Sequence, residues 1–145
     1  MNENFSIEAS LLCEKVISST KGRLSIINIF DRTSIPSNGI TRDELNVVFR
    51  VKRTNPTRQE LSVLKVRVMK PDGTQLQARR DGNQTLSPVE LTKNYLWTDK
   101  NYLNYITTFK NLHLIDTGLY SIDLFIDGGD DPIKSITWEV ITKQT

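Results

Sequence analysis

Hydrophobic and polar residues alternate along most of this chain with a period of two, the pattern of β-strands that bury one face. The first strand is expected over residues 5–13, where Leu12 is the one interruption of the alternation. Its buried face is expected to consist of Phe5, Ile7, Ala9, Leu11 and Cys13. The pattern therefore predicts an inner and an outer side for this strand.

Seven further segments carry a strand pattern. Six of them alternate and predict strands at residues 45–52, 64–69, 74–79, 103–109, 120–126 and 136–140. The seventh, residues 24–30, is apolar on both faces, so we expect a central strand covered from both sides. Residues 80–101 are the least regular part of the chain. Within them, residues 89–96 fit either a helical turn or an edge strand.

Turn sequences separate these segments, among them Pro71-Asp72-Gly73 and the Gly/Asp-rich residues 127–131. No segment shows a sustained 3.6-residue apolar period. The pattern therefore predicts an all-β fold, a two-sheet antiparallel β-sandwich of 7–8 strands. We expect a single domain over residues 1–145, because no repeat or change of composition marks a linker.

A short motif favours an immunoglobulin-like form of this sandwich. Asp116-Thr117-Gly118-Leu119-Tyr120 stands just before the strand expected at residues 120–126. In immunoglobulin-like domains, a tyrosine near the start of the penultimate strand hydrogen-bonds to backbone a few residues upstream. The motif is evidence about the fold and not about function.

Three parts of the chain carry a resemblance to a known family. They are Leu11-Leu12-Cys13-Glu14; the run Lys21-Gly22-Arg23-Leu24-Ser25-Ile26, which closes on Phe30-Asp31; and Gly118-Leu119-Tyr120-Ser121-Ile122 followed by Phe125-Ile126-Asp127-Gly128. In these parts the chain resembles an uncharacterised family of small bacterial β-sandwich proteins, a domain of unknown function. The resemblance implies the fold and a bacterial or phage origin. It implies no site residues.

Composition indicates a soluble, cytoplasmic protein. The chain is 37% hydrophobic and 25% charged, and no apolar run approaches the roughly 20 residues that a membrane helix needs. The acidic, polar start Met1-Asn2-Glu3-Asn4 is unlike a secretory signal. A single cysteine, Cys13, excludes an internal disulfide and agrees with a reducing compartment.

Charge is unevenly distributed although the net charge is only +2. Residues 42–80 carry ten Lys or Arg against four Asp or Glu, whereas residues 111–145 carry two against six. One interpretation is that basic and acidic strands neutralise each other as neighbours in a sheet. The other is a basic face that receives an anionic partner, which includes nucleic acid.

The sequence shows no catalytic apparatus and implies no cofactor. His113 and Cys13 are the only residues of their types, too few for a zinc site, and Cys13 is expected in the core. No Gly-rich phosphate loop occurs. Calcium at residues 127–131 stays open, with a plain hairpin turn as the alternative.

Aromatic and basic residues are interleaved in one stretch of the chain. Such residues serve as interface anchors or stacking platforms when exposed. The candidate binding residues are Tyr95, Trp97 and Tyr102, with Arg79 and Arg80 as a polar rim. The alternative is that two or three of these aromatic residues close the open end of the sandwich.

We therefore expect a non-enzymatic module that binds another protein or associates with itself. The main alternative is a small-ligand module that binds carbohydrate or calcium. An enzyme with an unfamiliar site and nucleic-acid binding through residues 42–80 remain as further possibilities. No membrane partner is expected, and nucleic acid is the less favoured partner because no recognised binding motif is present.

Overall fold

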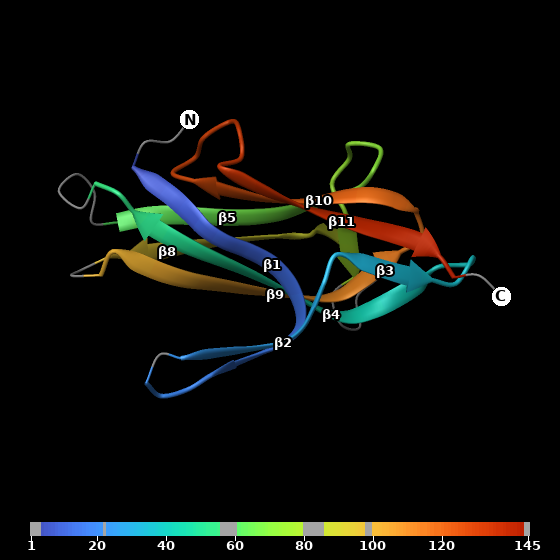
Figure 1. Ribbon diagram of the computed structural model, residues 1–145. Helices are drawn as coiled ribbons and strands as arrows, with labels where there is room; N and C mark the ends of the chain where they lie inside the picture. The colour runs from blue at the N-terminus through green and yellow to red at the C-terminus, as the bar shows by residue number, and fades with distance from the viewer. Residues whose placement is uncertain (1–3, 22, 56–60, 80–85, 98–99, 144–145) are drawn as a thin grey trace.

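A computed structural model describes residues 4–21, 23–55, 61–79, 86–97 and 100–143, in which every regular element is a β-strand (Figure 1). Within these ranges no helix is long and apolar enough to cross a membrane. The strands are β1 (Phe5–Ser18), β2 (Leu24–Phe30), β3 (Arg32–Ile35), β4 (Ile40–Arg53), β5 (Leu61–Met69), β6 (Gln77–Arg79), β7 (Leu86–Pro88), β8 (Glu90–Leu96), β9 (Tyr102–Leu114), β10 (Gly118–Ile126) and β11 (Lys134–Thr142).

The strands form two sheets, which confirms the all-β class and the two-sheet arrangement. A six-stranded sheet has the order β2-β1-β4-β9-β6-β7, and a five-stranded sheet has the order β3-β11-β10-β5-β8. Neighbours are antiparallel except for β3, which runs parallel to β11. The expected number of 7–8 strands is wrong, because the described residues form eleven. The additional ones are β3 and β7, too short to show alternation, and β8, which is an edge strand.

Alternating residues of the long strands form the core between the sheets, as the sequence predicts. Most of them lose all solvent contact, and burying a side chain of this size stabilises a fold by about 1.5–3 kcal/mol. The predicted core positions that are buried include Leu45, Val47, Phe49, Val51, Leu64, Val66, Val68, Tyr120, Ile122, Leu124, Trp138 and Val140.

The predicted inner face of β1 is correct only for its first half. The register against β4 shifts between Ile7 and Ala9, which is the mark of a β-bulge. After this bulge Leu12 lies opposite Val47 and enters the core, whereas Cys13 lies opposite Asn46 on the other face. Cys13 therefore lies on the opposite face of β1 from the one expected, whereas its expected place among the buried residues is confirmed. Burial raises the pKa of its thiol.

The prediction of a covered central strand at residues 24–30 is wrong. This segment is β2, the edge strand of the six-stranded sheet. Beyond Cys13, β1 leaves β4 and pairs only with β2, so the two strands project from the sheets as a hairpin (Figure 1). We call residues 14–21 and 23–30 the hairpin arm.

The hydrogen bond expected from the motif before β10 is present. The Tyr120 hydroxyl donates to the backbone carbonyl of Asp116 at 2.7 Å. Tyr120 is buried against Trp138, with ring centroids 5.4 Å apart. Burial, followed by the nearby carboxylates, raises the pKa of Tyr120 to about 12.

Candidate functional site

Trp97, the central candidate of the sequence prediction, lies in the core. It is 0% exposed and stacks on Phe5 with ring centroids 5.7 Å apart. Tyr95 meets its edge at 5.0 Å, and its indole N–H donates to the Ser62 hydroxyl at 2.7 Å. Trp97 therefore presents no surface to a partner in this arrangement, because both ring faces and the polar atom are occupied inside the protein.

Arg53 completes this closed end of the two sheets. It is buried, its guanidinium lies 5.4 Å from the Trp97 ring centre, and it donates to the carbonyl of Lys100 at 3.4 Å. Tyr95 is partly buried against the same cluster. The burial of Trp97 and the partial burial of Tyr95 agree with the alternative that aromatic residues close the end of the sheets.

Tyr102 occupies a different place from Trp97. It lies opposite Lys52 in the six-stranded sheet and is 43% exposed. The Arg50 guanidinium lies 4.6 Å from its ring centre, and the Lys52 ammonium lies 5.7 Å from it. Tyr102 and these two cations form an exposed basic–aromatic group, so its role as a binding residue stays a prediction.

The predicted polar rim consists of Arg79 and Arg80. Arg79 ends β6, and its side chain lies outside the described part of the molecule. Arg80 lies outside the described residues altogether. Their role as a polar rim therefore stays a prediction.

Basic and acidic strands do neutralise each other in the five-stranded sheet. Arg67 on β5 lies 3.5 Å from Asp123 on β10, and Lys70 lies 3.3 Å from Asp116. Asp123 is nearly buried and accepts two further hydrogen bonds from serine hydroxyls at 2.6 and 2.7 Å. This supports the first interpretation of the charge pattern for β5 and β10, while the basic residues of β4 belong to the other sheet.

Metal and nucleophilic sites find little support among the described residues. No three His, Cys, Asp or Glu side chains in the described part form a group that could hold a metal ion. Asp127 uses one carboxylate oxygen to accept the Val63 N–H at 2.9 Å, which ties the turn to β5. His113 lies opposite Thr41, five residues along β4 from the partner of Cys13, a separation of about 16 Å along the strand.

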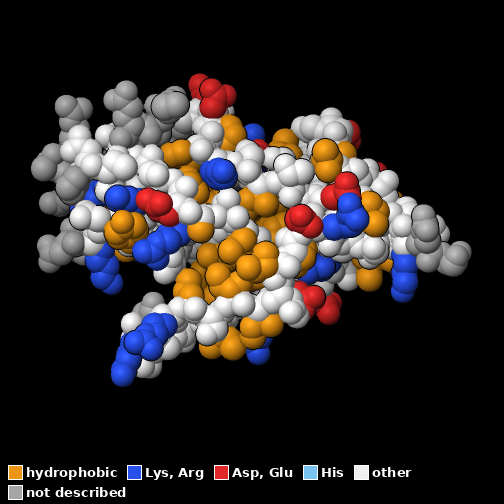
Figure 2. Space-filling view, in the orientation of Figure 1, with side chains coloured by type: hydrophobic (Ala, Val, Ile, Leu, Met, Phe, Trp, Pro, Cys, Tyr) orange, Lys and Arg blue, Asp and Glu red, His pale blue; other side chains and the backbone are white. Residues whose placement is uncertain are grey.

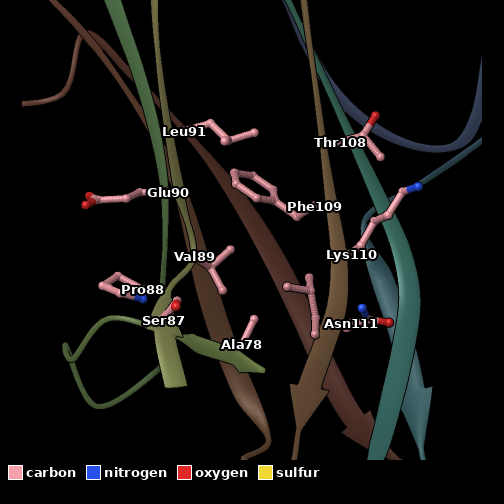
Figure 3. A pocket seen from close by; sticks show the side chains of 11 residues that line it. Ala78, Ser87, Pro88, Val89, Glu90, Leu91, Thr108, Phe109, Lys110 and Asn111 are labelled. Carbon is pink, nitrogen blue, oxygen red and sulfur yellow. The ribbon is translucent and has the colours of Figure 1, made fainter. Parts of the chain in front are cut away.

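A pocket of about 520 Å³ opens between β8 and β9 (Figure 3). Val89, Phe109 and Leu112 form its buried floor, and Phe109 extends toward Leu91. Lys110 also lines it. Pockets of this size hold small ligands in many proteins. The pocket has no signal in the sequence, because its lining residues belong to the segment from β6 to β9 and come together only through the arrangement of these strands.

The hairpin arm differs from an ordinary sheet edge in the lack of protective residues on its outer strand. Its outer strand β2 contains no charged residue and no proline. Ile29 is 64% exposed, Ile27 is 38% exposed, and Ile17 on the other strand is 46% exposed. Figure 2 shows hydrophobic side chains gathered over β1 and along the hairpin, with basic side chains at its tip.

Two asparagines hold the base of the arm. The buried Asn46 amide donates to the Glu14 carbonyl at 2.8 Å, at the point where β1 leaves β4, and its oxygen accepts the Thr108 hydroxyl at 2.7 Å. Asn28 has a positive φ of 56° and donates to the Glu14 carboxylate at 2.9 Å. These contacts fix the position at which the hairpin arm leaves the two sheets.

The absence of charge in residues 24–30 predicts burial, whereas in the structure it marks an exposed edge strand. A strand that is apolar on both faces has the same sequence pattern whether it is buried or exposed, and only its neighbours in the sheet distinguish the two.

Comparison with known proteins gives a family but no activity. Residues 8–141 match the model of a family of unknown function, DUF6941. No curated protein matches the chain. Because the match covers most of the chain, the protein belongs to this family of unknown function.

Proposed function

We propose that this protein is a non-enzymatic protein-binding or assembly module that docks through β2 of the hairpin arm. One observation carries the proposal: β2 is an edge strand without charge, and it exposes Ile27 and Ile29. This replaces the aromatic cluster around Trp97 as the place of contact. Tyr102 remains a candidate for a second contact.

Natural proteins protect the edges of their sheets, because a free edge pairs with other chains. They place lysine, proline or bulges there, or cover the edge with another element. β2 carries neither lysine nor proline over seven residues. An extended segment added to such an edge gains main-chain hydrogen bonds and buries alternate side chains.

The fixed base of the arm favours binding. An edge that is already extended and held by Asn46 and Asn28 loses less conformational freedom on association than a loose loop would. The arm also stands away from the body, which leaves room for a partner on its free side (Figure 1).

We extend the proposal to the finer fold and to the setting. The sheet orders, with β1-β4-β9 in one sheet and β11-β10-β5-β8 in the other, and the Tyr120 hydrogen bond support an immunoglobulin-like sandwich. The lone buried Cys13 supports a reducing, cytoplasmic compartment. The bacterial or phage origin rests on the family resemblance alone.

Site-specific photo-crosslinking tests the docking function. A photoreactive amino acid replaces Ile29 in cells of the native source, and the matched control replaces Leu119, which is 57% exposed on the other sheet. We expect adducts with an identified polypeptide from position 29, absent from position 119, and rebinding of that polypeptide in purified form. Equal adducts from both positions, or none from position 29, would contradict docking through β2.

A second candidate, a small-ligand module, is favoured by the pocket between β8 and β9. A panel of mono- and oligosaccharides screened by calorimetry tests it. The control is Leu91→Arg, which introduces a long cation at a half-exposed lining position. Saturable binding that this substitution removes supports the candidate, and heats that are identical for both proteins count against it.

A further inference from the structure

We infer that the partner of β2 is a second copy of this chain, paired antiparallel through β2 about a two-fold axis at Ile27. The inference rests on the proposed function, since it names the partner for the same strand. Two six-stranded sheets would thereby join into one continuous sheet across the dimer. The evidence is the apolar Ile27 on the axis and the opposite charges of Arg23 and Asp31, which flank the strand at equal distances from it.

Apolar residues of β2 meet one another at two places in this register. Ile27 lies opposite its own copy and Leu24 lies opposite Phe30, as positions equally distant from the axis. The other two pairs set an apolar residue opposite a polar one, Ser25 with Ile29 and Ile26 with Asn28. A two-fold interface uses the same patch on both subunits. The exposed side chains of Ile27 and Ile29 gain apolar neighbours from the other copy in place of water.

Charge fixes the register. Arg23 and Asp31 flank β2, each four residues from Ile27, and both are exposed. The antiparallel pairing places each Arg23 opposite the partner's Asp31, so two oppositely charged pairs close the two ends of the interface. A parallel pairing in register instead places like charges together, which disfavours it.

The same polarity extends beyond the strand. The tip of the arm also carries Lys21, whereas the base carries Glu14 beside Asn28. In the antiparallel dimer Lys21 and Arg23 at the tip of each arm approach Glu14 and Asp31 at the base of the other, where Arg42 also lies beside Phe30. Steering of this kind raises the rate of encounter and weakens with salt.

The contact is small for a permanent dimer. A single seven-residue strand pair lies below the size of standard stable interfaces. We therefore expect a dimer that forms with increasing concentration, and a tighter one at low ionic strength.

Sedimentation velocity of the full chain tests the inference, at concentrations from about 1 μM to about 1 mM, the range in which weak interfaces dissociate. We expect the wild type to shift from monomer to dimer. Ile29→Lys places a charge on the strand and should leave a monomer with an unchanged thermal midpoint. The matched control, Leu119→Lys on the other sheet, should dimerise like the wild type.

Charge reversal tests the register itself. Arg23→Asp and Asp31→Arg should each raise the dissociation constant about tenfold, since each sets like charges opposite one another. The double variant restores opposite charges at both ends and should return to within about twofold of the wild type. No rescue, or a dimer that survives Ile29→Lys, overturns the inference.

The two proposals can fail separately. A wild type that stays monomeric throughout the concentration range, yet crosslinks from position 29 to a different polypeptide, overturns self-association and leaves the docking function standing. Absence of any adduct from position 29 removes the docking function, and the self-pairing with it.

Discussion

Trp97 and Tyr102 look alike in the sequence but occupy opposite environments. Both are aromatic residues in a polar, basic stretch, five positions apart. The structure buries Trp97 between Phe5 and Ser62, whereas Tyr102 lies on an outer face beside Arg50. Which of them enters the core depends on sheet pairing with β4 and β5, and local sequence does not encode that pairing.

This difference predicts different stabilities for two alanine variants. Trp97→Ala removes a fully buried ring and orphans the Ser62 contact, so we expect the free energy of unfolding to fall by about 3–5 kcal/mol. Tyr102→Ala removes an exposed ring with two solvent-exposed cation–π contacts and should cost less than about 1 kcal/mol. Urea unfolding measures both. Equal losses would mean that Trp97 is not the core residue seen here.

The Tyr120 hydroxyl predicts a loss of stability in strong alkali. Folding raises its pKa from about 10 to about 12, mainly through burial, so the folded state favours the protonated form. The contribution of the protonated Tyr120 hydroxyl to the free energy of unfolding is complete below pH 10. It is lost as pH rises from about 10 to about 12. We expect Tyr120→Phe to be less stable at neutral pH, by about 0.5–1.5 kcal/mol, and to show a shallower alkaline decline.

Unfolding free energies of both proteins at closely spaced alkaline pH values provide the measurement. Tyr105 also has a raised pKa through burial and remains in both proteins, so the difference between them isolates Tyr120. Parallel alkaline declines in the two proteins would contradict the assignment.

At the scale of elements, alternation predicts the buried face of the long strands. It fails where an irregular backbone turns the following side chains to the opposite face. Strands β4, β5, β10 and β11 have the core positions that the sequence indicates. The bulge in β1 between Ile7 and Ala9 resets the alternation of that strand, and it has no strong local signal in the sequence. The sequence predicts β2 as a covered strand, because a strand that is apolar on both faces usually lies inside a sheet. The structure instead places it at an edge.

The departure of the hairpin arm depends on Asn46. Asn46→Ala removes a buried side chain and its two part-buried hydrogen bonds, with the Glu14 carbonyl and the Thr108 hydroxyl, and we expect a loss of about 1–3 kcal/mol. Amide hydrogen exchange along the arm should also accelerate more than exchange in the core of the sheets. The control is Asn104→Ala, which removes one half-exposed contact with Arg50 and should leave the arm amides unchanged.

At the scale of the whole molecule, the short strand β3 ties the end of the hairpin arm to the five-stranded sheet. The chain passes from β2 in the six-stranded sheet directly to β3, which joins the five-stranded sheet beside β11. Arg32 pairs with Glu139, and the indole N–H of the buried Trp138 donates to the Thr33 hydroxyl at 2.9 Å. The position of the hairpin arm relative to the five-stranded sheet therefore depends on β3 staying attached.

The Thr33 hydroxyl should be the decisive part of that attachment. Thr33→Val keeps the shape but leaves the buried indole N–H of Trp138 without an acceptor, at an expected cost of about 1–3 kcal/mol. Thr33→Ser keeps the hydroxyl, loses a methyl group and should cost less than about 1 kcal/mol. Chemical unfolding measures both, and exchange of the β3 amides should rise only in the valine variant. If serine costs as much as valine, the methyl contact and not the hydrogen bond holds β3 in place.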